Sequence, residues 1–184
     1  MVEALFLDIK AAFLSIILEQ LIHNMRKRGI PRQYTEWIKN RVEGRSTQIA
    51  FDEFTSCRVS LEQGIDQGCP LSGVLFQFYN AGILDIMEKK QGEDSVAVVD
   101  DTTILVRGAD LQEANEKLAD IMNRPNGVMD WAEAHNCCFA LNKFGLIGFT
   151  RRREKKHRRA NENQAGAETN TTAKQLQYRT KKLT

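Results

Sequence analysis

Two adjacent aspartates, Asp100 and Asp101, stand between apolar and β-branched residues in the segment 96–106, Val-Ala-Val-Val-Asp-Asp-Thr-Thr-Ile-Leu-Val. Such flanks are typical of β-strands, so the segment predicts a hairpin with both carboxylates at its turn. Two carboxylates about 4 Å apart repel each other by about 4 kcal/mol at an effective dielectric near 20. A hard divalent cation such as Mg²⁺ would offset that repulsion. The alternative is an ordinary turn, in which aspartate is common.

The composition is that of one folded domain without a membrane segment. The 184 residues suffice for a sizeable core, and 42% hydrophobic with 27% charged residues is typical of a soluble globular protein. No apolar run approaches the roughly 20 residues that span a membrane, and the first residues carry no basic leader, so neither a membrane partner nor secretion is expected. The cysteines lack Cys-x-x-Cys spacing, which favours reduced thiols in an intracellular protein. They are Cys57, Cys69, Cys137 and Cys138.

Charge is divided unevenly along the chain. Residues 1–150 carry 15 basic residues against 21 acidic ones, whereas residues 151–184 carry 11 against 3. The sequence therefore predicts a folded domain over 1–150 and a disordered basic tail over 151–184, where apolar residues are too sparse for a core. Basic runs bind nucleic-acid phosphates or serve as nuclear import signals, which predicts a nuclear protein; the alternative is a solvated stretch. The run comprises Arg151, Arg152, Arg153, Lys155, Lys156, Arg158 and Arg159.

The order of the expected elements indicates an α+β fold, with an antiparallel sheet packed against helices on one face. An apolar opening stretch predicts a strand buried on both faces, 4–9. Helical spacing predicts helices over about 16–28, 31–44, 71–89 and 110–135, the last interrupted at Pro125. Further strands are expected at 47–51, 58–61, 138–141 and 146–150.

A third carboxylate, Asp8, ends the apolar opening strand. Burying an ionised acid is costly unless it is paired, binds a metal or becomes neutral. If this strand lies beside the hairpin of Asp100 and Asp101, three carboxylates converge at one end of the sheet. Such a cluster suits two-metal phosphoryl or nucleotidyl transfer, in which the ions activate a hydroxyl and stabilise the leaving phosphate.

Four segments, taken in order, are similar to the motifs of one enzyme family. Residues 5–13 resemble its first motif, an apolar strand that ends in Asp and is followed by Ala-Phe. Residues 64–72 resemble its Gly-x-Pro-Gln-Gly-Ser-Pro-Leu-Ser motif, residues 98–101 its aromatic-x-Asp-Asp motif, and residues 142–150 its Lys-x-Glu-Leu-Ile-x-Phe-Thr segment. Over residues 4–153 the chain thus resembles the palm region of the reverse transcriptase domain of a non-LTR (LINE-type) retrotransposon.

The resemblance implies a polymerase palm with RNA-directed DNA polymerase activity, acting on an RNA template, a DNA primer and dNTPs. It also implies the catalytic metal site. Asp8 and Asp100 would be the main ligands of two Mg²⁺ ions, with Asp101 assisting. Mn²⁺ would serve as an alternative cofactor.

The same resemblance implies substrate-binding roles for five further residues. Phe13 would pack beneath the sugar of the incoming nucleotide, although an ordinary core aromatic is the alternative. Lys143 would approach the triphosphate or protonate the leaving pyrophosphate, and a solvated surface lysine is the alternative. The loop before the long helix would hold the template strand and the nascent base pair, unless it is only a helix entry; its residues are Gln67, Gly68 and Pro70.

Five positions depart from the family pattern: Leu14 replaces an aspartate, Asp66 a proline, Cys69 a serine, Gly73 a second proline and Val98 an aromatic residue. The fingers and thumb expected around a palm are not recognisable, so they are expected to be missing or to come from another polypeptide. Positioning of substrates accounts for much of catalysis, which puts the activity of the isolated fragment in question. One alternative is a non-catalytic nucleic-acid-binding protein acting through the basic tail. Another is a different two-metal palm enzyme, which the Gln67-Gly68 loop disfavours.

Overall fold

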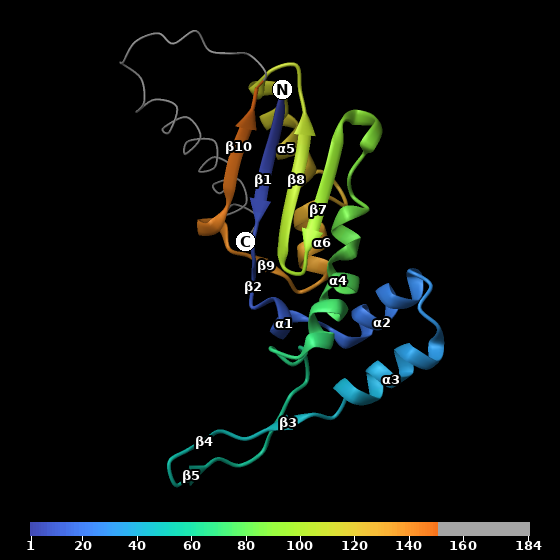
Figure 1. Cartoon of the computed structure of the whole chain (residues 1–184), viewed down its shortest axis with the longest axis vertical. Helices are drawn as coiled ribbons and strands as arrows, with labels where there is room; N and C mark the ends of the chain where they lie inside the picture. The colour runs from blue at the N-terminus through green and yellow to red at the C-terminus, as the bar shows by residue number, and fades with distance from the viewer. Residues whose placement is uncertain (151–184) are drawn as a thin grey trace.

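The computed structural model describes residues 1–150, and its centre is a four-stranded antiparallel sheet (Figure 1). The strand order is β10-β1-β8-β7. The bounds are Val2–Leu7 for β1, Glu93–Val98 for β7, Asp101–Arg107 for β8 and Gly145–Phe149 for β10. The predicted α+β fold with an antiparallel sheet is confirmed. The predicted disordered tail, 151–184, lies outside the described residues.

Three helices lie on one face of this sheet (Figure 1). Helix α4 (Pro70–Leu84) contacts β7, α5 (Leu111–Asn123) contacts β1 and β8, and α6 (Val128–Ala134) contacts both helices. Alternate strand residues point toward them, because successive side chains of a strand face opposite sides. Leu5, Ile104 and Val106 are accordingly buried in the core. None of the described helices is long and apolar enough to cross a membrane.

The other face of the sheet exposes apolar side chains. Phe6 of β1 is 40% exposed. It pairs with Thr103 of β8, which in turn pairs with Val96 of β7, and Val96 is 55% exposed. The prediction of a strand buried on both faces is therefore wrong at Phe6. The apolar composition of the strand was misleading because the helices cover only one side of the sheet.

The helix expected over 16–28 is present as α2 (Leu18–Lys27), and a short helix that was not expected, α1 (Ala12–Ser15), precedes it. The backbone is extended at Ile16, between the two helices. The apolar stripe of α2 packs against α4 and against α3 (Arg32–Val42). Gly29, with φ of +84°, lies in the turn after α2, and Pro31 occupies the N-cap position of α3.

Residues 44–62 form a narrow two-stranded ribbon that extends away from the body in Figure 1. Strands β3 (Ser46–Thr47) and β6 (Val59–Ser60) pair at its base, and β4 (Ala50–Phe51) and β5 (Phe54–Thr55) pair at its tip. The predicted hairpin is present, with shorter strands than expected. All eight residues of the four ribbon strands are exposed, so these strands pack little against the core.

The remaining elements are short. β2 (Ile9–Lys10) pairs with β9 (Cys138–Phe139), and two 3₁₀ turns cover Lys89–Gln91 (η1) and Leu141–Lys143 (η2). The long helix expected to reach residue 89 ends at Leu84. The break expected near Pro125 is present, because α5 ends at Asn123 and α6 begins at Val128.

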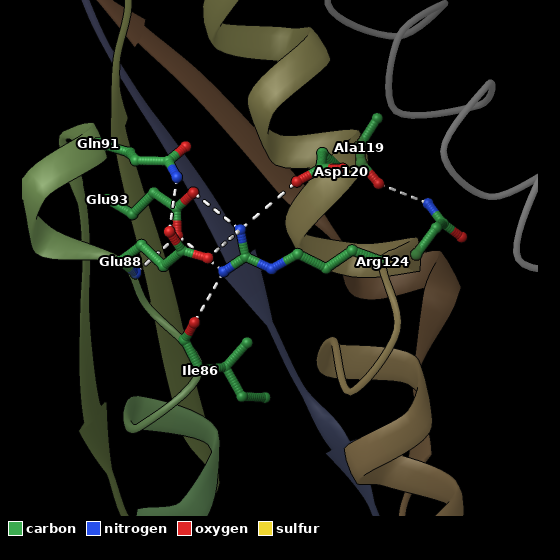
Figure 2. A network of polar contacts seen from close by, with 8 residues as sticks. Ile86, Glu88, Gln91, Glu93, Ala119, Asp120 and Arg124 are labelled. Atoms are coloured by element: carbon green, nitrogen blue, oxygen red, sulfur yellow. Dashed lines mark hydrogen bonds and ion pairs between the residues drawn. The ribbon is translucent and has the colours of Figure 1, made fainter.

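An arginine at the end of α5 fastens the helices to the edge of the sheet (Figure 2). The Arg124 guanidinium donates to both carboxylate oxygens of Glu93, at 3.0 and 2.9 Å, and to the Ile86 carbonyl at 2.7 Å. Glu88 and Asp120 lie 3.7 and 3.4 Å from the same group. Glu93 is only 3% exposed, so its charge depends on this partner. The contact to Glu93 also raises the pKa of Arg124.

A buried polar cluster joins the helices beneath the sheet. The His135 ring stacks on Trp131 with centroids 4.5 Å apart, and its Nδ1 lies 2.8 Å from the Trp131 carbonyl. Its Nε2 faces the side-chain amides of Gln20 and Asn24 on α2, at 3.3 and 3.4 Å. Tyr79 of α4 donates its hydroxyl to the His135 carbonyl. Burial lowers the pKa of His135, so the neutral imidazole, donating from Nδ1 and accepting at Nε2, fits the cluster.

Candidate active site

The end of β1 delivers Asp8 to the same edge of the sheet as the paired aspartates. The last pair of the ladder between β1 and β8 is Leu7 with Thr102. Asp8 directly follows Leu7 and Asp101 directly precedes Thr102, so both aspartates lie at the same end of the ladder. The Asp8 carbonyl accepts a 2.8 Å hydrogen bond from the backbone N–H of Ala140. This bond fixes the backbone of Asp8 where the chain leaves the central sheet.

The turn that carries Asp100 is strained and clamped. Val99 has φ of 56°, a left-handed conformation that is unfavourable for a β-branched residue. Asn80, buried on α4, donates to the Val99 carbonyl and to the Thr102 hydroxyl, both at 3.1 Å. The clamp thus bridges the residues on either side of the two aspartates. Backbone strain of this kind persists only where the surroundings enforce it, and it is concentrated at functional sites.

Asp8 and Asp100 line one cleft of about 420 Å³. Phe13, Gln67 and Lys143 line the same cleft, so it brings together five of the residues that the sequence singled out. Lys10 and Asn142, which the sequence reasoning did not select, are also present. Their sequence positions could have indicated them, because Lys10 stands two residues after Asp8 and Asn142 directly before Lys143.

The other predicted site residues lie beside the cleft and are not among its lining. Asp101 begins β8, opposite Val98, and is exposed. Gly68, with φ of +88°, lies in the turn before α4, and Pro70 is the first residue of that helix. The seven basic residues selected in the tail lie outside the described residues.

The loop that carries Gln67 is fastened to the segment that carries Phe13. Gly64 N–H donates to the Ile16 carbonyl and Ile65 N–H to the Phe13 carbonyl, both at 2.8 Å. Gly64 has φ of +81°, and a Cβ there would lie 3.0 Å from the Leu14 Cα and the Phe13 oxygen. Only glycine allows this approach of the two backbones. The Phe13 ring in turn packs on Phe76 of α4, with centroids 5.7 Å apart.

Two departures from the family pattern have local explanations. Asp66 forms an ion pair with Arg45, whose side chain is largely buried, and lies 4.0 Å from Arg41. The extra negative charge is thus compensated within the protein. Cys69 occupies the N-cap position of α4, where the backbone N–H of Leu71 is the largest cause of the lowered pKa of its thiol. Val98 is 62% exposed beside the turn, and nothing in the structure explains the choice of valine there.

The donors in the cleft fit a hard cation. Asp8 and Asp100 offer carboxylate oxygens, and Mg²⁺ is commonly held by one or two carboxylates together with substrate phosphates. Within residues 1–150, no group of three or more metal-binding side chains is preassembled. A site completed by a phosphate-bearing substrate is compatible with that arrangement.

A sheet covered on one face, with carboxylates at the end of its central strands, is the palm architecture of nucleotidyltransferases. A model of the reverse transcriptase (RNA-dependent DNA polymerase) family matches residues 3–162, and the chain therefore belongs to this family. A Pol polyprotein from the type-2 retrotransposable element R2DM of Drosophila melanogaster is 28% identical over 86 residues, which is 47% of this chain and 8% of that protein. The predicted assignment to a retrotransposon reverse transcriptase is confirmed.

Solved structures agree with the fold. Apo telomerase from Candida tropicalis superposes with a TM-score of 0.57 at 10% identity, over 80% of this chain and 28% of that chain. The telomerase of the same organism in complex with a TWJ fragment of telomeric RNA gives 0.55 at 12% identity, over 79% and 26%. The predicted palm fold is therefore confirmed. The chain spans less than a third of these telomerases and less than a tenth of the R2DM polyprotein.

Proposed function

We propose that this chain forms the palm of an RNA-directed DNA polymerase from a non-LTR retrotransposon and supports two-metal nucleotidyl transfer. The observation that carries the proposal is the shared cleft, which is lined both by Asp8 from the end of β1 and by Asp100 from the β7-β8 turn. Family membership supports the reaction class. The strained and clamped turn supports a catalytic role for Asp100 over an ordinary turn.

The metal ligands would be Asp8 and Asp100, with Asp101 assisting from the start of β8. Bound Mg²⁺, or Mn²⁺, would lower the pKa of the attacking hydroxyl and neutralise charge on the phosphates. The protein's own contribution is to hold the two carboxylates in place. The bond from Ala140 fixes the Asp8 backbone, and the Asn80 clamp fixes the turn that carries Asp100.

The other lining residues suit the substrates of such a reaction. Phe13 would pack against the sugar of an incoming dNTP, and a ring at that place would exclude a 2′-hydroxyl. Gln67, with Gly68 and Pro70 behind it, would contact an RNA template paired to a DNA primer, where the α4 N-terminus favours phosphate. The surfaces that grip template and primer would come from further residues of a longer protein or from another polypeptide.

Primer extension tests the proposal. The purified chain should extend a DNA primer on an RNA template with Mg²⁺ and dNTPs, and Asp100→Ala should reduce extension at least about 100-fold. Asp94→Ala, at an exposed position of β7 outside the cleft, is the matched control and should extend like the wild type. Extension by the wild type no greater than that of Asp100→Ala would reject polymerase activity for this chain.

The basic tail supports a second proposal, non-catalytic nucleic-acid binding and nuclear import. Residues 151–184 carry 11 basic residues against 3 acidic ones, whereas residues 1–150 carry an acidic excess that repels phosphates. Deleting 151–184 should abolish binding to RNA in a filter assay and exclude a fluorescent fusion from nuclei. Wild-type binding should weaken steeply with salt. Equal affinity with and without the tail would contradict this proposal.

A further inference from the structure

A lysine holds the Asp8 carboxylate in the candidate active site. The Lys143 ammonium lies 3.1 Å from Oδ1 and 3.1 Å from Oδ2 of Asp8. Lys143 ends the 3₁₀ turn η2, and its own N–H donates to the Ala140 carbonyl. Ala140 also binds the Asp8 backbone. A short chain of backbone bonds therefore fixes the position from which the ammonium reaches Asp8.

The ammonium uses the same oxygen atoms that a metal ion would need. An ammonium equally close to both oxygens of a carboxylate occupies the side on which a metal ion would bind both of them, and its charge repels the ion, although each oxygen keeps a further lone pair. The Asp8 and Lys143 side chains are 25% and 60% exposed, so the pair opens onto the solvent of the cleft. Ion pairs with that exposure contribute little free energy and exchange readily. Lys143 is thus placed to compete with a metal and to be displaced by it.

We propose that Lys143 is the internal counter-cation of Asp8 and competes with a divalent cation for the Asp8 carboxylate. The inference rests on the proposed metal-binding role of Asp8. It assigns Lys143 a role in the protein before substrate arrives, beyond the contact with a triphosphate that the family resemblance implies. The ion pair would weaken metal binding in the absence of substrate. Of the two carboxylates that line the cleft, Asp8 is already neutralised by Lys143, and only Asp100 keeps a charge that no ion pair within residues 1–150 compensates.

A matched control lies in the same cleft. Lys10 lines it and carries the same charge, yet within residues 1–150 it forms no ion pair with Asp8. Removing Lys10 therefore reports the general effect of one positive charge near the metal. Removing Lys143 reports that effect together with direct competition for the carboxylate.

Mn²⁺ binding to the full chain, measured by electron paramagnetic resonance without nucleotide or nucleic acid, tests the proposal. Lys143→Met should bind Mn²⁺ about fivefold more tightly than the wild type, which corresponds to about 1 kcal/mol. Lys10→Met should change the affinity less than about twofold, because its charge acts only at a distance. Lys143→Arg keeps the cation and should bind like the wild type. Urea unfolding of each variant checks that it is folded.

The outcomes separate this proposal from the proposed function. Wild-type affinity in Lys143→Met, or a gain no larger than that of Lys10→Met, would overturn the counter-cation role. Weaker binding in Lys143→Met would overturn it too, by showing that Lys143 supports the metal site. Asp8→Asn should lose the Mn²⁺ site; unchanged binding in that variant would reject Asp8 as a ligand and with it the proposed function's metal site.

Discussion

At the scale of single residues, the candidate site depends on side chains that hold the backbone around the two aspartates. Asn80 is the clearest case, because a buried amide on α4 binds both sides of the Asp100 turn. Its own Oδ1 is buried without a hydrogen-bond partner in the described part of the chain. A buried amide with an unpaired oxygen is costly, so its stabilising effect comes from the two bonds that it donates.

We therefore expect Asn80→Leu, which keeps the volume and removes both donors, to lower the free energy of unfolding by about 2 kcal/mol. The left-handed Val99 would also lose its clamp, so amide hydrogen exchange at Asp100 and Asp101 should accelerate. Urea unfolding and exchange measured by NMR report the two effects. The matched variant Asn123→Leu loses only an exposed bond to the Ala119 carbonyl and should cost less than about 0.5 kcal/mol. Equal losses in the two variants would contradict the clamp.

At the scale of elements, one ion pair links the end of α5 to the edge strand of the sheet. Arg124 lies between α5 and α6, whereas Glu93 begins β7 (Figure 2). Arg124→Met should lower the free energy of unfolding by at least about 3 kcal/mol, because Glu93 is left charged and buried. The double variant E93Q/R124M should recover part of that loss, since the uncompensated charge is gone.

The control for this ion pair is Arg32→Met. Its bond to Glu36 lies within one turn of α3 on the surface, so its loss should cost less than about 0.5 kcal/mol. Chemical denaturation of the three variants and the wild type measures these differences. A double variant as unstable as Arg124→Met alone would show that the arginine acts by packing and not by neutralising Glu93.

At the scale of the whole molecule, His135 links stability to pH. It connects α2, α4 and α6, and burial lowers its pKa in the folded protein. The unfolded chain then binds a proton more readily than the folded one, so the stability contributed by the neutral ring is complete above about pH 6.5. It is lost as the pH falls from there toward the lower pKa of the folded state.

Unfolding free energies measured by urea between pH 5 and 8 should therefore fall toward acid in the wild type, and less in His135→Gln. His23→Gln, on the exposed side of α2, should keep the wild-type dependence. Burial raises the pKa of Glu3, which favours the folded protein as the pH falls, but Glu3 is common to all three proteins. Identical pH profiles for the wild type and His135→Gln would contradict the role of His135.

Sequence patterns predicted most of the elements because their signals are local. The flanks of Asp100 gave the hairpin, and the apolar stripe of residues 18–25 gave α2. They failed where burial depends on distant partners, and Phe6 is exposed because the helices cover one face only. They also missed the short helix α1, which begins after a left-handed Ala11 and is separated from α2 by an extended backbone at Ile16 and Ile17.

For the candidate site, the sequence by itself determined the family and the candidate ligands: carboxylates at strand ends, in the order and spacing of a reverse transcriptase palm. Tertiary structure alone decided which residues meet. It places Asp8 and Asp100 in one cleft, pairs Lys143 with Asp8 across 135 residues, and fixes the Asp100 turn from α4 through Asn80. The physical reason is that motifs record local propensity and charge, whereas the partner of a buried or charged group is set by the packing of segments that are distant in the chain.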